Sequence, residues 1–92
     1  MNDVLISIEW LIGKLDIHII ILTSVGGYTK KVDSIYNKHK LEKILKAIMY
    51  NDFETLTNFM KDRYDLSHVT IRFAYGKTLR KKIKEFRKEN KF

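Results

Sequence analysis

Large apolar residues recur at every second position along the first third of the chain, and this pattern most constrains the fold. They occupy alternate positions from Val4 to Ile12 and again from Leu15 to Ile21, and most are β-branched. A period of two indicates strands with one buried face, and β-branched side chains favour strands. Gly13-Lys14 interrupts the pattern and predicts a two-residue hairpin loop, in which glycine supplies a positive φ.

A helical interpretation of the same stretch is also possible, because apolar residues recur at three- and four-residue spacing from Val4 to Leu22. The hairpin is favoured because a turn at Gly13-Lys14 sets large apolar residues opposite each other along both strands. It also predicts a cross-strand pair between Glu9 and His18 on the other face of the sheet.

A second glycine pair, Gly26-Gly27, predicts another tight turn and hence a three-stranded antiparallel meander over residues 1–36. The face predicted to be covered by helices bears Ile6, Ile8, Trp10, Ile17, Ile19, Ile21, Val32 and Tyr36. The opposite face bears the apolar residues Leu5, Leu11, Ile20, Leu22 and Ile35. Apolar residues that stay uncovered on a folded domain typically mark an interface, so these five predict a homodimer.

Beyond the meander the apolar period changes to that of helices. It predicts one amphipathic helix from about residue 38 to about residue 50 and a second one with Asn51 as its N-cap. A fourth strand is expected over Val69–Tyr75, followed by a helix capped by Thr78. The expected fold class is α+β, in the order β-β-β-α-α-β-α, as a single domain over residues 1–92 with a mainly antiparallel sheet.

The segment from Gly76 to Phe92 carries nearly all of the net charge. It contains eight basic residues and two acidic ones, and so contributes six units of the net charge of +7. Such asymmetry is typical of a surface that binds a polyanion, most often nucleic acid. The predicted phosphate-binding residues are Lys77, Arg80, Lys81, Lys84, Arg87 and Lys88, with Arg72 on the preceding strand and Lys30, Lys31, Lys38 and Lys40 nearby.

Two functions from different classes follow from this composition. The first is a small non-enzymatic protein that binds DNA or RNA through its C-terminal helix. The alternative is a viral or mobile-element interaction module, an inhibitor or adaptor that binds an acidic or nucleic-acid-handling protein. The steepness with which affinity falls with salt distinguishes them, because phosphate contacts release counterions and an apolar protein interface does not.

A third, minor alternative concerns His68-Val69-Thr70, which resembles the His-x-Thr signature of the two-histidine phosphoesterases. That resemblance implies phosphodiesterase chemistry with His68 as acid or base, and it requires a second such motif. The other candidate, His18-Ile19-Ile20, lacks the hydroxyl residue at its third position, so His68 is expected to be a strand-end residue.

No metal or cofactor site is predicted, because the chain has no cysteine and Glu9 and His18 have no evident further ligands. The absence of cysteine is compatible with a reducing cytoplasm, where the protein is expected to reside. The apolar stretch from Val4 to Val25 contains charged residues, each of which costs about 2.5–3.5 kcal/mol at a bilayer centre, so a membrane span is not expected.

Overall fold

The computed structural model describes residues 2–89 and has the predicted order of elements. These are β1 (Asn2–Leu11), β2 (Lys14–Thr23), β3 (Gly26–Ile35), α1 (Lys38–Met49), α2 (Phe53–Tyr64), β4 (Val69–Tyr75) and α3 (Lys77–Glu89). The predicted α+β class and the order β-β-β-α-α-β-α are confirmed. Lys91, one of the basic residues of the C-terminal segment, lies outside the described residues.

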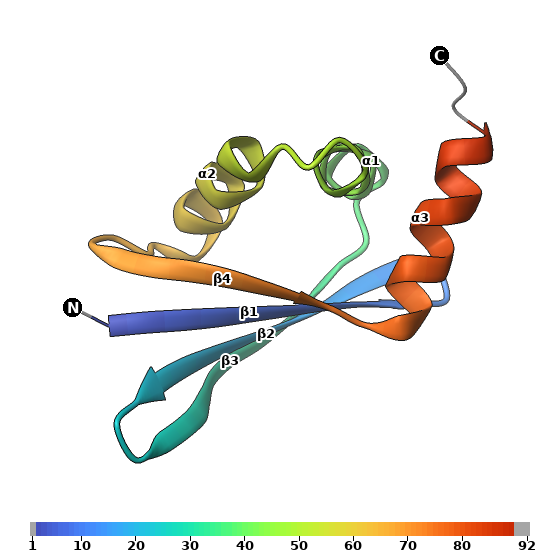
Figure 1. Cartoon of the computed structure of the whole chain (residues 1–92). Helices are drawn as coiled ribbons and strands as arrows, with labels where there is room; N and C mark the ends of the chain where they lie inside the picture. The colour runs from blue at the N-terminus through green and yellow to red at the C-terminus, as the bar shows by residue number, and fades with distance from the viewer. Residues whose placement is uncertain (1, 90–92) are drawn as a thin grey trace.

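The four strands form one sheet in the order β3-β2-β1-β4. The meander β1-β2-β3 is antiparallel as predicted, whereas β4 pairs in parallel with β1, so the sheet is mixed. Strands that run in the same direction need a long crossover connection between them, and α1 and α2 provide it between β3 and β4. They lie together over one face of the sheet, and α3 rises from the end of β4 beside α1 (Figure 1).

The first hairpin differs from the prediction in register. Its loop is Ile12-Gly13, and both residues have positive φ values of 24° and 77°. Trp10 therefore lies opposite Leu15, and Glu9 lies opposite Asp16 and not opposite His18, so the predicted Glu9–His18 pair is wrong. The register differs by two residues, and since strand side chains alternate with a period of two, each apolar residue keeps its predicted face.

The second hairpin turns at Ser24-Val25, before Gly26, which takes a φ of 136°. Farther along β3 the pairing with β2 shifts by one residue between Ile19 and Ile20, as in a β-bulge. A one-residue shift exchanges the two faces of a strand. The placement of Ile35 on the uncovered face is therefore wrong, since it is 1% exposed in the core. Val32 and Tyr36, expected in the core, are 58% and 67% exposed.

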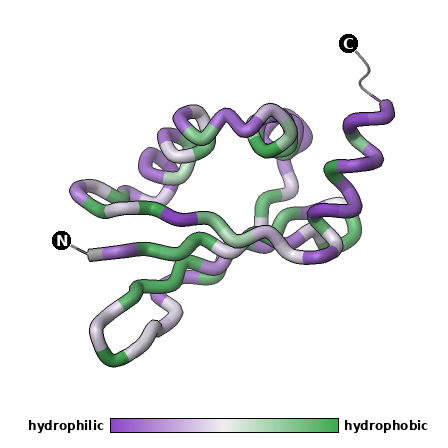
Figure 2. The backbone as a smooth tube through the Cα atoms, viewed as in Figure 1, coloured by the Kyte–Doolittle hydropathy of each residue, from purple (hydrophilic) through white to green (hydrophobic). Residues whose placement is uncertain are grey.

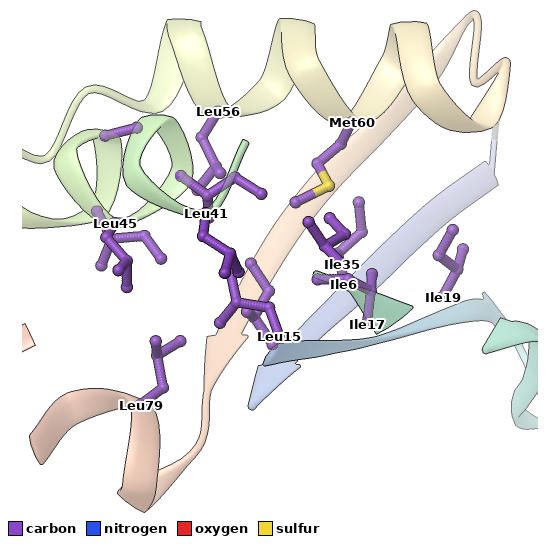
Figure 3. Packing of buried hydrophobic residues seen from close by; sticks show 14 of the residues in the cluster. Ile6, Leu15, Ile17, Ile19, Ile35, Leu41, Leu45, Leu56, Met60 and Leu79 are labelled. Atoms are coloured by element: carbon purple, nitrogen blue, oxygen red, sulfur yellow. The ribbon is translucent and has the colours of Figure 1, made fainter. Parts of the chain in front are cut away.

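The core lies between the sheet and the helices, and Figure 3 shows side chains from both layers pointing toward one another. Its most deeply buried side chains are Val4, Ile6, Ile8, Leu15, Ile17, Ile19, Ile35, Ile44, Leu56, Met60 and Leu79. Asn37 caps α1 by accepting a hydrogen bond from the Lys40 amide. The cap of α2 is Asp52 and not the expected Asn51, and its carboxylate accepts from the Thr55 amide.

A polar contact joins β3 to the last turn of α2. Asp33 Oδ2 accepts hydrogen bonds from Arg63 Nε at 3.0 Å and from Tyr64 Oη at 2.9 Å. Partial burial opposes ionisation, but the hydrogen bonds from Tyr64 and Arg63 prevail and hold the pKa of Asp33 below its ordinary value. The contact therefore stabilises the ionised form of Asp33.

Candidate nucleic-acid interface

Helix α3 is anchored to the core by a narrow apolar stripe. Leu79, Ile83 and Phe86 are 0%, 8% and 7% exposed, and all three belong to the core cluster. Figure 3 shows Leu79 pointing from α3 toward that cluster, and Figure 2 shows that the helix is otherwise almost entirely hydrophilic. This stripe holds the rest of the α3 surface in a defined orientation toward solvent.

The start of α3 is tied to β1 and not capped by Thr78 as expected. The helix begins at Lys77, and the amide of Leu79 donates to Glu9 Oε1 at 2.9 Å. The same oxygen accepts from the Trp10 amide at 2.9 Å, and the Gly76 amide donates to the Ile8 carbonyl. A carboxylate from another element thus satisfies an amide of the first helical turn, where negative charge is favoured.

Six cationic side chains share one face of α3. At about 100° per residue, Lys77, Arg80, Lys81, Lys84, Arg87 and Lys88 fall within an arc of about 120°. All six are exposed, and the acidic residues Glu85 and Glu89 lie on the flank of this arc. These six residues, here called the basic face, are the ones that the sequence predicts on this helix. Most of them also line a shallow hollow together with Thr78.

Two cations of α3 have structural contacts. Arg87 donates from Nη2 to the Met49 carbonyl at 3.2 Å and so links α3 to the C-terminus of α1. Lys82 lies off the basic face, with Nζ 5.1 Å from the centre of the Trp10 ring. For the other five residues of the basic face, the described part of the chain contains no ion pair with a carboxylate. Their charge is therefore available to a ligand.

The remaining predicted cations do not join the basic face. Arg72 pairs with Leu5 across the β1–β4 ladder, so its side chain lies on the sheet face that α1 and α2 leave uncovered, here called the open face. Lys30 and Lys31 lie on β3, at the opposite edge of the sheet from β4. Lys38 and Lys40 lie in the first turn of α1. Of the predicted phosphate-binding residues, only those on α3 therefore lie together on one surface.

The open face contains four of the five predicted interface residues. Leu5, Ile20 and Leu22 are partly exposed there, and Leu11 is 43% exposed. The bulge in β3 adds Val32 and Tyr36 to this face in place of Ile35. The charged residues Asp3, Glu9, Lys14, Asp16 and Arg72 also lie on it. This face is nearly balanced in charge, in contrast to the basic face.

A groove between α1 and α3 was not foreseen from the sequence. This α1–α3 groove is lined by Ile48, Tyr75, Leu79 and Ile83, with Arg80, Lys84 and Arg87 at its edge. Tyr75 Oη is buried there with no hydrogen-bond partner among residues 2–89. From the sequence, Tyr75 is either a stacking residue beside the basic helix or a core residue, and the core is favoured. No periodic pattern predicts which two helices will lie side by side.

The two histidines of the phosphoesterase-like pattern are far apart. His68 is exposed and precedes β4 with a φ of 56°. His18 lies on β2 opposite Ser7, and Ser7 lies opposite Ala74 on β4. Six residues of β4 therefore separate them along the strand direction, about 20 Å at 3.3 Å per residue. The pair that this chemistry requires is not assembled.

Within the described residues, no group of three or more His, Cys, Asp or Glu side chains is placed to hold a metal ion. In the same part of the chain, no helix is long and apolar enough to cross a membrane. No protein-family model, curated protein or solved structure matches this chain, so the interpretation of the basic face depends on its own geometry.

Proposed function

We propose that the protein binds nucleic acid through phosphate contacts made by the basic face of α3. The observation that supports this most strongly is the convergence of six exposed cations on one side of a helix that is anchored to the core. Clustered lysine and arginine side chains gain affinity for nucleic acid by releasing condensed counterions, without reading the base sequence.

The length of the basic face suits a phosphate backbone. Lys77 and Lys88 are eleven residues apart, which corresponds to about 16 Å along a helix axis. Nucleotides of one strand advance by about 3.4 Å each along a duplex axis, so the face spans about five of them. Several of the six cations can therefore reach phosphates at the same time.

The experiment compares two variants that each lose four positive charges. In the first, Arg80, Lys81, Lys84 and Lys88 are replaced by Gln, and Arg87 is kept because it bonds α1. In the matched control, Lys30, Lys38, Lys40 and Lys46 are replaced by Gln, all exposed and outside the basic face. Both variants retain the core and are expected to keep the fold.

Fluorescence anisotropy with a labelled duplex, measured at several salt concentrations, provides the readout. The unmodified protein should show a steep decrease of log affinity with log salt. The α3 variant should lose about three to four units of that slope, about 0.9 for each lost contact. The control variant should change much less. Equal affinities for the α3 variant and the unmodified protein would refute the proposal.

A second proposal, from the protein-interaction class, concerns the open face. Its partly exposed Leu5, Ile20 and Leu22 share this face with Val32 and Tyr36, which are more than half exposed. We infer that this face contacts a second copy of the chain, because its balanced charges permit two copies to approach although the protein as a whole carries +7. A twofold assembly would also present two basic faces to one polyanion.

A further inference from the structure

The α1–α3 groove differs from the rest of the basic surface because its floor is apolar. Ile48, Leu79 and Ile83 line it together with Tyr75. Its volume of about 230 Å³ is below the roughly 300–1,000 Å³ of pockets that hold whole drug-sized ligands. The groove therefore suits a single ring system better than an extended ligand.

Tyr75 supplies an unused polar group in this groove. Its hydroxyl is buried without a hydrogen-bond partner among the described residues, which is uncommon in native proteins. Burial raises the pKa of Tyr75, so the hydroxyl is protonated at neutral pH and can both donate and accept. A ring with polar atoms on its edge is complementary to this arrangement.

The cations at the edge of the groove connect it to the basic face. Arg80, Lys84 and Arg87 border the groove and also belong to the basic face. A nucleic-acid strand whose phosphates lie along these residues therefore passes the mouth of the groove. In a single strand a base can turn away from the backbone into an apolar site, whereas in a duplex the base must first be unpaired and unstacked.

We propose that the α1–α3 groove receives one unpaired base of a single-stranded nucleic acid, and that side chains around the groove move so that the hydroxyl of Tyr75, which is buried in this structure, bonds to the edge of that base. This inference rests on the proposed function, since the phosphates of the same strand lie on the basic face. It specifies the ligand class as single-stranded nucleic acid. The affinity for such a ligand would come from the apolar contact of one base as well as from the charge of the phosphates.

The test uses three labelled probes: a single strand of ten thymidines, an abasic strand of equal length and charge, and a ten-base-pair duplex. A protein that only contacts phosphates should bind the thymidine and abasic strands equally and prefer the duplex, whose charge density is higher. With one base bound in the groove, the thymidine strand should bind about tenfold more tightly than the abasic strand. It should also bind more tightly than the duplex.

Tyr75→Phe isolates the role of the hydroxyl. Because this hydroxyl has no partner among the described residues, its removal should leave the melting temperature unchanged or slightly raised. Affinity for the thymidine strand should fall about fivefold, while affinity for the abasic strand stays the same. Tyr28→Phe, on the edge strand β3 and away from both the groove and the open face, is the matched control and should change neither affinity.

The outcomes separate this inference from the proposed function. Equal binding of the thymidine and abasic strands, or a Tyr75→Phe variant that binds both as the unmodified protein does, would overturn the groove assignment alone. In that case the variant with four Gln replacements on α3 still loses affinity for every probe. If that variant binds all three probes as well as the unmodified protein does, both proposals are refuted.

Discussion

The carboxylate of Glu9 on β1 accepts a hydrogen bond from the backbone amide of Leu79, in the first turn of α3, at 2.9 Å. Seventy residues separate the two along the chain. The bond joins the central part of the sheet to the start of the helix that carries the basic face. It thereby orients the six cations relative to the rest of the protein.

Replacing Glu9 by Ala should destabilise the protein by about 1–2 kcal/mol. The substitution leaves the amide of Leu79 without its acceptor and removes a negative charge from a helix N-terminus. Glu9→Gln is the matched control, because it keeps an acceptor oxygen and loses only the charge, and it should cost about 0.3–1 kcal/mol. Urea unfolding measures both values. Equal stability of all three proteins would show that the contact is not stabilising.

Gly76→Ala should be destabilising, and its cost should depend on Glu9. A Cβ at residue 76 would occupy the position of the Glu9 carboxylate, so the carboxylate must move and lose its bond to Leu79. We expect a cost of about 1–3 kcal/mol in the unmodified background. In the Glu9→Ala background the cost should be clearly smaller, because the obstructing group is gone. Additive effects in this double-mutant cycle would contradict the steric explanation.

Asp33→Asn should lower stability near neutral pH by about 1–2 kcal/mol, because hydrogen bonds from Tyr64 and Arg63 stabilise the charged carboxylate. The folded-state pKa of Asp33 lies below its ordinary value of 3.8. Its contribution to stability is therefore fully present above the unfolded pKa and is lost as the pH falls through the folded pKa. The free energies of unfolding of the unmodified protein and of the variant, measured from pH 7 to pH 2, should therefore converge at the acid end. A constant difference between the two proteins would contradict this linkage.

Ile12→Asn should stabilise the first hairpin. Ile12 is fully exposed, and its φ of 24° is unfavourable for a β-branched residue, whereas Asn before Gly is favoured in a two-residue loop with two positive φ values. A gain of about 0.5–1 kcal/mol corresponds to a melting temperature higher by about 4 °C. Val25→Asn is the control, since Val25 is equally exposed but has no positive φ, and it should change little.

Ile20→Lys or Leu22→Lys should dissociate a dimer formed through the open face. Sedimentation equilibrium of the unmodified protein at about 100 μM should show a species of twice the monomer mass of 11.0 kDa. Either substitution should restore the monomer mass, whereas Val25→Lys, in the loop between β2 and β3, should not. A single species at the monomer mass for the unmodified protein would remove this proposal and leave the basic face unaffected.

Local patterns in the sequence were sufficient to predict the helices and strands and much of the candidate site. The change of period from two to 3.6 predicted α1 and α2 because a buried helix face must recur with the helical period. The faces of β1 and β2 were also predicted correctly, although the turn lies one residue earlier than expected at Ile12-Gly13. The grouping of six cations on α3 follows from helical spacing alone.

Other features were decided by contacts between distant segments, which no local pattern contains. The bulge in β3 placed Ile35 in the core, left Val32 and Tyr36 outside it, and put Asp33 within hydrogen-bond reach of Arg63 and Tyr64 on α2. The parallel pairing of β4 with β1 placed Gly76 beside Glu9, so a carboxylate on β1 caps α3 in place of Thr78. The α1–α3 groove exists because α3 packs against α1 as well as against the sheet. The sequence thus determined the elements and the charge of α3, and tertiary packing decided what surrounds that charge.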